Sequence, residues 1–446
     1  MKNKIIIIVS LFALAIEAQE KKESYSFSLK QAVEHAVQNN YSAINADRDI
    51  EAAKQKKWET TTIGLPQING NVGYVNNFEI QRSLIPAEIF GGPAGTFQEV
   101  AFGTKHSMNA SATLSQLIFD GSYLVGLQSA KTYLKISENA KIKTTQEIKE
   151  IVINSYGNVL LADESILILQ KNKGILEKTL SDTKEIYKNG LIEEENVEQL
   201  QITLASINSS LVNVKRQKNI ANDMLKLILG IDLGNELKLT DKLDKLAQNN
   251  VDLAILKEEF NSSNTIDYQI GQNLQTTKEL LLKLEKSKAL PTLSANMNFG
   301  YNAFGDQFQF FSTNQKWLNY SNLGLNLNIP IFSSFGRTSR TQQAKIALEQ
   351  SKTQLTETEQ KLKLQFEKAK SDYEFSIEQL GTSKSNLNLA ERIESKNQIK
   401  FTEGLASSFD LTKAQEQLYS SQQNYLQAML DVINKRASLE KIFNKN

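Results

Sequence analysis

The side chains that most often carry chemistry are scarce in this sequence of 446 residues. It contains no cysteine, which removes disulfides, thiolate metal sites and a cysteine nucleophile. Its two histidines, His35 and His106, stand in different segments, and we interpret both as surface or loop residues rather than metal ligands. No HExxH motif, glycine-rich phosphate loop or Ser-His-Asp set is present. We therefore expect that the protein is not an enzyme and that it has no catalytic, cofactor-binding or metal site.

Charge and hydropathy exclude two further classes of protein. Lysine and arginine number 51 and acidic residues 50, a formal net charge of +1, and no basic stripe is visible. Nucleic-acid binders normally carry a basic excess on one face, so we expect no nucleic-acid partner. The mean hydropathy of −0.37 argues against a bundle of membrane helices. The chain is also longer than one compact core usually is, which predicts two or more structural units.

The N-terminus has the composition of an export signal. Lys2 and Lys4 precede the apolar run IIIIVSLFALAI, and the sequence then turns polar. That order is typical of a secretory signal peptide. The run is too short for a membrane-spanning helix, which needs about 20 residues. We predict a signal peptide over residues 1–18, with cleavage after Ala18.

Long helices are predicted on both sides of two similar bends. All five prolines lie between residues 66 and 93 or between 291 and 330, so none interrupts the rest of the mature chain. The bends read YKNGLIEEENVEQLQ (187–201) and FTEGLASSFDLTKAQ (401–415). Apolar residues recur with 3-4 spacing for several heptads before and after the first bend. This pattern predicts antiparallel coiled-coil hairpins.

A shift of about 214 residues superimposes the second half of the chain on the first. Val152, Ile166 and Tyr187 then fall on Phe366, Leu380 and Phe401. A long repeat with matching heptads indicates one structural unit that has been duplicated. We predict a first repeat over 19–230, a linker over 231–248 and a second repeat over 249–446. The helical hairpins are expected over 120–229 and 336–445.

Four segments alternate between polar and apolar side chains, the period of a β-strand with one polar face. They lie near 66–78, 107–118, 291–303 and 318–332. Their length of about ten residues suits a transmembrane β-barrel. Aromatic residues near the strand ends, expected at the membrane interface, are Tyr74, Phe78, Phe299, Tyr301, Trp317 and Tyr320. The insertion at 79–104 is expected to be an exposed outer loop.

The number of strands constrains the assembly. A sheet in lipid cannot leave an edge unpaired, and one chain offers only four strands. Barrels of about eight strands, as two chains would build, are filled by side chains. Three chains of four strands give a barrel of twelve with room for a pore. The predicted fold is an α+β membrane protein, a homotrimer whose 12-stranded barrel stands on a helical tunnel.

The duplicated order of helix, Leu-Pro, hairpin, long helix, Gly-Leu bend and long helix resembles the TolC-like outer-membrane efflux proteins. FSLKQAVEHAVQNNYSAINA (27–46) resembles the opening helix of the family. LPQINGNVGY and LPTLSANMNFGY resemble the entries into its two β-hairpins, and MLKLILGI (224–231) resembles the end of its first repeat. The resemblance covers nearly the whole mature chain. It implies an outer-membrane channel-tunnel that extends into the periplasm.

This resemblance also implies partners and a role. The channel is expected to pass substrates from an inner-membrane pump and a periplasmic adaptor across the outer membrane, in a tripartite efflux or a type I secretion system. In the family, the two bends are the periplasmic tips that close the tunnel and dock the adaptor. By resemblance, these positions are Gly190, Leu191, Gly404 and Leu405. Glycine at each bend also has a local reason, since it accepts the positive φ that ends a helix.

The family's periplasmic gate transfers only in part. Asp410 stands where members can carry an acidic residue that faces the tunnel, and Asn196 is its uncharged counterpart in the first repeat. Phe401 replaces a tyrosine, while Lys413 and Ala406 replace an acidic and a basic residue. A latch made of salt bridges is therefore not expected. The purely structural alternative for Asp410 is the N-cap of the helix after the bend.

A second class of function stays open on the sequence, a soluble periplasmic coiled-coil protein such as the adaptor. Adaptors carry helical hairpins but lack paired strands with a lipid-compatible face. The four alternating segments therefore favour the channel. The transported substrate, and the choice between small molecules and proteins, stay open.

Overall fold

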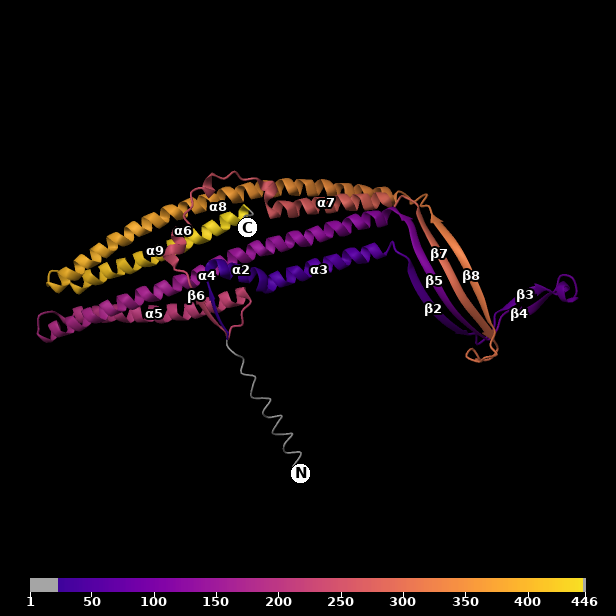
Figure 1. Ribbon diagram of the computed structural model, residues 1–446, viewed down its shortest axis with the longest axis horizontal. Helices are drawn as coiled ribbons and strands as arrows, with labels where there is room; N and C mark the ends of the chain where they lie inside the picture. The colour runs from indigo at the N-terminus through magenta and orange to yellow at the C-terminus, as the bar shows by residue number, and fades with distance from the viewer. Residues whose placement is uncertain (1–22, 444–446) are drawn as a thin grey trace, which may run out of the picture. The chain divides into compact units, whose positions relative to one another are not determined.

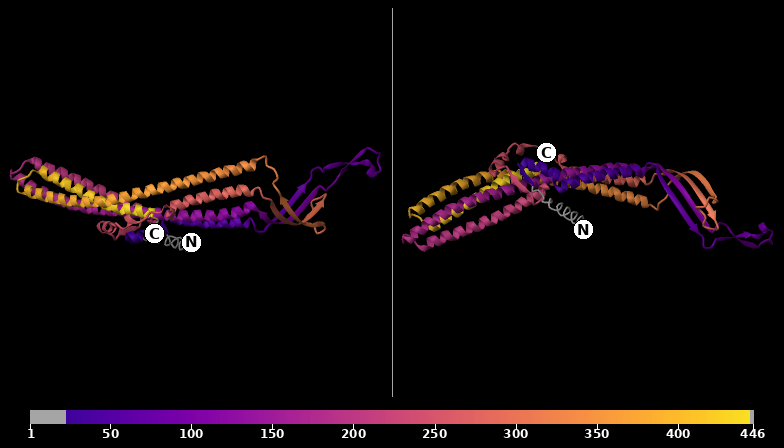
Figure 2. Two further views of the ribbon diagram at one scale, coloured as in Figure 1. Left: turned by 90° about the horizontal axis from the view of Figure 1, so that it is seen from above. Right: turned by 60° about the horizontal axis from the view of Figure 1, so that its bottom comes forward.

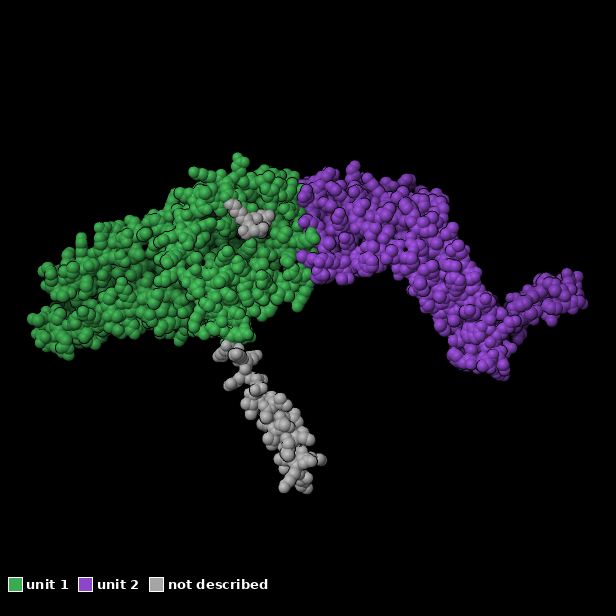
Figure 3. Space-filling model, in the orientation of Figure 1, with its two compact units in different colours: residues 1–49, 137–271, 355–446 green, residues 50–136, 272–354 purple. Residues whose placement is uncertain are grey.

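The computed structural model describes residues 23–443, so the predicted signal peptide and its cleavage site lie outside the described residues. The chain divides into two compact units (Figure 3). The strand unit contains residues 50–136 and 272–354, and the hairpin unit contains the remainder. Each unit draws on both halves of the sequence, so the units cut across the two repeats. The repeat boundaries therefore stay a prediction.

The strand unit contains a four-stranded antiparallel sheet in the order β2-β5-β7-β8 (Figure 1). Its strands are β2 (Gln67–Asn76), β5 (His106–Asp120), β7 (Thr292–Gly305) and β8 (Trp317–Asn328). The central pair, β5 and β7, joins the two halves of the chain. Strand β8 ends sooner than the sequence pattern suggested, because Pro330 has no N–H to continue a ladder.

One face of this sheet is a ladder of small polar side chains. Asn69, Thr113, Asn298 and Asn322 stand side by side across all four strands. The Thr113 hydroxyl donates to Asn298 Oδ1 at 2.7 Å, and Asn298 Nδ2 donates to Asn322 Oδ1 at 2.9 Å. The opposite face carries exposed apolar residues, which include Ile68, Val72, Phe299, Leu323, Leu325 and Leu327.

The register corrects one aromatic assignment. Tyr320 pairs with Gly300 and stands on the polar face, two residues from Asn322. A Cβ at Gly300 would lie 2.6 Å from the Tyr320 ring, so the ring covers the glycine. The prediction that Tyr320 belongs to the interfacial girdle is therefore wrong. Phe299 and Tyr301 do stand on or near the exposed apolar face, because both have the parity of Met297.

The insertion between β2 and β5 has a small structure of its own. Strands β3 (Arg82–Pro86) and β4 (Phe97–Ala101) form an antiparallel hairpin. The 3₁₀ turn η1 (Ala87–Phe90) connects them. Each strand of the four-stranded sheet is next to a helix in the sequence. These helices are α3 (Tyr41–Thr62), α4 (Gly121–Lys188), α7 (Ile266–Ser287) and α8 (Gly336–Thr402).

Two helical hairpins dominate the hairpin unit and lie side by side (Figures 1 and 2). The first consists of α4 and α5 (Glu194–Leu229), and the second of α8 and α9 (Ser408–Ile442). Among the described helices, α4 alone is long and apolar enough to cross a membrane. Core helices of soluble bundles share this property. The buried positions of α4, which include Val152, Tyr156 and Leu176, pack into hydrophobic clusters of the unit.

Short elements surround the middle of these helices. They are β1 (Ser24–Phe27), α2 (Leu29–Asn39), β6 (Glu236–Leu239), α6 (Leu243–Asn249), η2 (Ile255–Lys257) and η3 (Ser262–Asn264). Strands β1 and β6 pair in parallel, so the segment expected as a linker is folded. The buried Tyr156 hydroxyl donates to Phe27 O at 2.9 Å, and Tyr373 donates to Asn250 O at 2.6 Å.

Candidate functional site

Both bends are built by the same backbone motif. Gly190 and Gly404 adopt φ values of 71° and 72°, as the sequence predicted for these glycines. In the first bend, Gly190 N–H donates to Tyr187 O and Leu191 N–H donates to Ile186 O. Gly404 and Leu405 make the equivalent bonds to Phe401 and Lys400. This is the Schellman ending of a helix, in which glycine takes the left-handed position.

The leucines that follow the glycines point away from the helices. Leu191 is 74% exposed and Leu405 is 73% exposed. In many Schellman motifs the residue at this position packs on the last helical turn. Here the apolar side chains of both leucines are exposed at the tips of the two hairpins. The backbone motif explains the glycines, and it leaves the leucines available for a partner.

The start of α9 corrects the structural alternative for Asp410. Its N-cap is Ser407, and Asp410 occupies the third helical position. The Ser407 hydroxyl accepts from Asp410 N–H, while Asp410 Oδ2 accepts from Ser407 N–H at 3.2 Å and from its hydroxyl at 2.8 Å. Asp410 is therefore half of a capping box. These bonds from Ser407 lower the pKa of Asp410, so its carboxylate stays ionised at neutral pH.

Asn196 connects the two bends of one chain. Its Oδ1 accepts a hydrogen bond of 3.1 Å from the N–H of Ser408, the first helical residue of α9. The first N–H groups of a helix have no partner within it. The side chain of Glu193, the N-cap of α5, makes no capping hydrogen bond, so Asn196 is not part of a capping box in its own helix. The equivalent positions Asn196 and Asp410 are thus used differently, one between the hairpins and one within its own helix.

Phe401 packs against the first hairpin. The apolar cluster near the bends contains Leu176, Leu180, Val197, Leu200 and Ile207, all from α4 and α5. Phe401 and Tyr419, from α8 and α9, are partly buried against it. The structure thus brings Phe401 and Asn196 into the contact between the hairpins. It leaves Asp410, Leu191 and Leu405 exposed.

Between this cluster and the larger apolar cluster, in which α4 meets α9, the contact between the hairpins includes polar side chains. Asn172 Nδ2 donates to Gln422 Oε1 at 2.9 Å, and the Ser165 hydroxyl donates to Gln423 Oε1 at 3.4 Å. A cavity of about 360 Å³ lies among α4, α5 and α9 beside these residues. Polar residues at a helix interface fix its register at a cost in stability. Separating the hairpins would therefore expose little apolar surface here.

A half-buried acid near the bends, Glu394, escaped the sequence analysis. Burial raises the pKa of Glu394 on α8, more than the neighbouring Gln415 lowers it. Burial also raises the pKa of Tyr419, and Glu394 adds to this effect. The duplication held a signal for this residue, because a shift of 214 places Glu394 on Leu180 of the apolar register. An acid at a core position of a heptad is the unusual feature.

Replacing Glu394 by glutamine should stabilise the hairpin unit at neutral pH. An acid whose pKa is raised by folding favours the folded state below its unfolded pKa. This contribution is lost as the pH rises through the raised value. Glu394→Gln should therefore raise the Tm at pH 7 and lose this advantage in acid. Thermal unfolding followed by circular dichroism at several pH values checks it. An equal gain at every pH would show that charge is not the cause.

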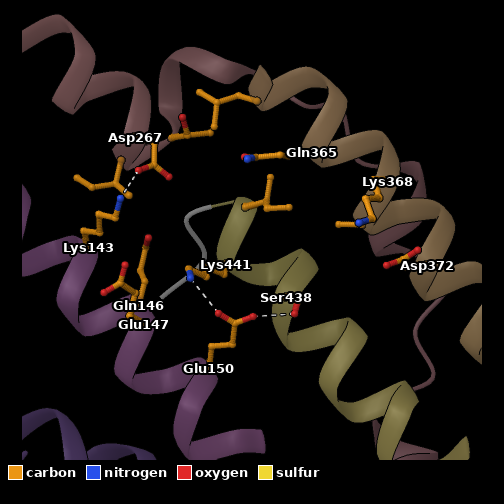
Figure 4. A pocket seen from close by; sticks show the side chains of 15 residues that line it. Lys143, Gln146, Glu147, Glu150, Asp267, Gln365, Lys368, Asp372, Ser438 and Lys441 are labelled. Atoms are coloured by element: carbon orange, nitrogen blue, oxygen red, sulfur yellow. Dashed lines mark hydrogen bonds and ion pairs between the residues drawn. The ribbon is translucent and has the colours of Figure 1, made fainter. Parts of the chain in front are cut away.

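A second polar network lies at the C-terminal end of α9 (Figure 4). Lys441 Nζ contacts Glu150 Oε2 at 2.9 Å, and the Ser438 hydroxyl donates to Glu150 Oε1 at 2.7 Å. Lys143 bonds Asp267 at 2.8 Å across the same cavity of about 370 Å³. Burial alone would raise the pKa of Glu150, but its bonds to Lys441 and Ser438 lower it. The network ties α9 to α4.

Each of the two histidines contacts nearby side chains. His35 lies against Phe27, with ring centroids 5.0 Å apart, and near Asn39 Nδ2. His106 stacks on Tyr74 and shares a hydrogen bond of 2.9 Å with its hydroxyl. Within residues 23–443, no group of three or more His, Asp or Glu side chains could hold a metal ion.

Comparison with known sequences points to one family. Residues 281–445 match the family described as outer membrane efflux protein. Over 344 residues the chain is 21% identical to the outer membrane protein TolC of Vibrio cholerae. The match covers 76% of this chain and 73% of that protein.

Solved structures with the same fold cover nearly the whole chain. CusC has a TM-score of 0.76 at 16% identity, over 96% of this chain and 95% of that one. VceC of Vibrio cholerae has a TM-score of 0.72 at 14% identity, over 94% and 96%. The CmeC outer membrane channel of Campylobacter jejuni has a TM-score of 0.71 at 17% identity, over 96% and 90%. These likenesses confirm the predicted fold.

Proposed function

Because this chain belongs to the TolC-like outer-membrane efflux protein family, we propose that three copies of it form the exit duct of an efflux system. The family resemblance predicted from the sequence is confirmed. The chain is an outer-membrane protein with helices that reach into the periplasm. The relatives are channel proteins, and we propose the same for this chain, with no enzymatic activity.

The observation that carries the proposal is the sheet with two free edges. Within residues 23–443, strands β2 and β8 each pair on one side only, and their apolar face is exposed. In lipid, the open N–H and C=O groups of an edge strand must find partners. Since β2 and β8 run antiparallel to each other, β8 of one copy can pair with β2 of the next. Three copies close a barrel of twelve strands whose polar face lines the pore.

The hairpins supply the other end of the duct. We propose that the exposed Leu191 and Leu405 dock the apolar grooves of a periplasmic adaptor, beside Gly190 and Gly404. The Asn196–Ser408 bond and the packing of Phe401 would hold the hairpins of one chain together at rest. Polar side chains such as Asn172 and Gln422 line part of the contact between the hairpins, while apolar clusters hold the rest of it. The proposed direction of transport is from an inner-membrane pump, through the adaptor, to the outside, with the insertion at 79–104 outermost.

The purified protein should have the mass of three chains. Edge pairing in a closed ring requires every β2 to meet a β8, and three copies give the smallest barrel with an open pore. Sedimentation in detergent with density matching, together with cross-linking, measures the mass. Planar-bilayer recordings of the same sample should show conductance. A cross-linked mass of two chains would contradict the proposal.

Three copies of Asp410 should favour the passage of cations. A ring of carboxylates concentrates negative potential at a pore. Asp410→Asn keeps an acceptor for Ser407 but loses the charge, while Asp410→Ala loses both. In planar bilayers both variants should show weaker cation preference, and only Asp410→Ala should have a lower Tm. The preference should persist until the pH falls through the lowered pKa of Asp410. Because Lys413 lies one turn away, we expect a modest change.

Unchanged ion selectivity in both variants, with a lower Tm for Asp410→Ala alone, would show that Asp410 only completes the capping box of α9. The soluble periplasmic alternative finds no support in the comparisons, because the family is one of outer-membrane proteins. Protein export through a type I system remains a second candidate on the same architecture. A strain that lacks the gene separates the two roles, by lost tolerance to toxic small molecules or by retention of a secreted protein.

A further inference from the structure

The turn between β8 and α8 exposes a row of large apolar side chains on the strand unit. Ile331 is 89% exposed, Phe332 is 75% exposed and Phe335 is 74% exposed. They continue the exposed apolar face of β8, on which Leu325 and Leu327 stand. Folded proteins rarely leave such a patch in contact with water. Continuity with the face assigned to lipid places this turn at the edge of the membrane.

The turn is held in a fixed shape. The Arg337 guanidinium donates to Pro330 O at 2.8 Å, to Ile331 O at 3.2 Å and to Ser333 Oγ at 3.1 Å. Ser334 and Phe335 adopt positive φ values of 48° and 62°, which side chains other than glycine rarely take. The Phe332 and Phe335 rings meet edge to face, 6.0 Å apart. The apolar side chains are thus presented outward by a structured turn.

Basic side chains gather beside these rings. The turn and α7 line a hollow of about 490 Å³ that includes Glu285, Lys286 and Arg337. Glu285 is already engaged by Lys288 at 2.6 Å and by Arg340 at 3.5 Å. Within the described part of the chain, neither Lys286 nor Arg337 forms an ion pair. Four basic groups and one acid leave a local charge of +3 next to the apolar turn.

We propose that this junction, residues 329–340 with Lys286 and Lys288, binds the headgroup of an anionic phospholipid in the periplasmic leaflet. The phosphate would meet Lys286 and the positive charge of Arg337, and the acyl chains would lie on Phe332 and Phe335. Anionic lipid supplies both partners at once, a phosphate for the cations and hydrocarbon for the rings. The inference rests on the proposed function, since that role places the sheet in the outer membrane.

Fluorescence quenching by brominated lipid tests this site in the full-length protein. Trp58→Phe and Trp317→Phe remove both native tryptophans, and Phe332→Trp places one reporter in the turn. Vesicles contain phosphatidylcholine and phosphatidylglycerol in equal parts, with bromine on the chains of one lipid or the other. Each basic group near an anionic lipid should enrich it by about fivefold. Brominated phosphatidylglycerol should therefore quench the reporter more than brominated phosphatidylcholine does.

Two charge variants distinguish a headgroup site from general attraction. Lys286→Gln with Lys288→Gln should sharply weaken the preference for phosphatidylglycerol while quenching by both lipids persists. Lys131→Gln with Lys345→Gln removes the same charge from exposed positions farther along α4 and α8, and should keep the preference. Loss of preference in this control would overturn the proposal.

Two results in the parent protein would also overturn it. Equal quenching by the two lipids would mean that the turn enters the membrane without selecting a headgroup. Absence of quenching by either lipid would mean that another copy of the chain covers the turn. Mass and conductance measured on the same samples separate these failures from a failure of the channel proposal, since a conducting trimer can exist without the lipid site.

Discussion

Replacing Leu323 by arginine should prevent most of the protein from reaching a folded state in the outer membrane. Leu323 is 70% exposed on the apolar face, near the middle of the 12-residue strand β8. An arginine that faces lipid at the membrane midplane costs about 2–4 kcal/mol. Three chains repeat this cost in one barrel. The amount of trimer in outer-membrane fractions, resolved on gels without heating, measures the effect.

The neighbouring residue provides the matched control. Gly324 belongs to the polar face, opposite Asn296, and only the Asn296 carbonyl oxygen, at 4.0 Å, approaches the position of a Cβ there. Gly324→Arg adds the same charge one residue away, where it should meet water in the pore. Its trimer yield should stay near normal, and its conductance should shift away from cations. Similar yields for the two variants would refute the assignment of one face to lipid and the other to the pore.

Gly230→Ala should be among the most destabilising single substitutions in the hairpin unit. Gly230 ends α5 with a φ of 72°, and a Cβ there would lie 2.1 Å from the carbonyl oxygen of Asn39. Asn40 Nδ2 bonds Ile228 O at 2.7 Å in the same contact, so the backbone cannot shift freely. Forcing α2 and α5 apart disturbs the core around Leu225 and Leu229. We expect a loss of about 3–5 kcal/mol.

Gly190→Ala separates backbone strain from collision. Gly190 has nearly the same φ of 71°, but no atom of the described residues lies within 4 Å of the position of its Cβ. Only the left-handed backbone then opposes alanine, at about 1–2 kcal/mol. Thermal unfolding by circular dichroism at one scan rate should show a large fall in Tm for Gly230→Ala and a small one for Gly190→Ala. Equal falls would mean that the contact with Asn39 is not tight.

Local periodicity determined much of this protein without any knowledge of its tertiary structure. The alternation of Asn and Leu along β8 and the heptads around Val152 depend only on how a strand or a helix presents successive side chains. The bends at Gly190 and Gly404 depend on one backbone angle that glycine adopts freely. The same alternation along β8 places Tyr320 on the polar face with Asn322. The assignment of Tyr320 to the membrane interface went against that pattern.

Tertiary structure alone decided which of these segments meet. The pairing of β5 with β7, and of β1 with β6, joins residues about 200 positions apart, and no local rule selects such partners. The use of Asn196 follows from the approach of the two hairpins, which brings the N–H of Ser408 within reach of its side chain. The repeat aligns Glu394 with an apolar position, but only the packing shows that it is half-buried beside Gln415 and Tyr419. Hydrogen bonds and desolvation act over a few ångströms in space, so their partners are fixed by packing rather than by position in the chain.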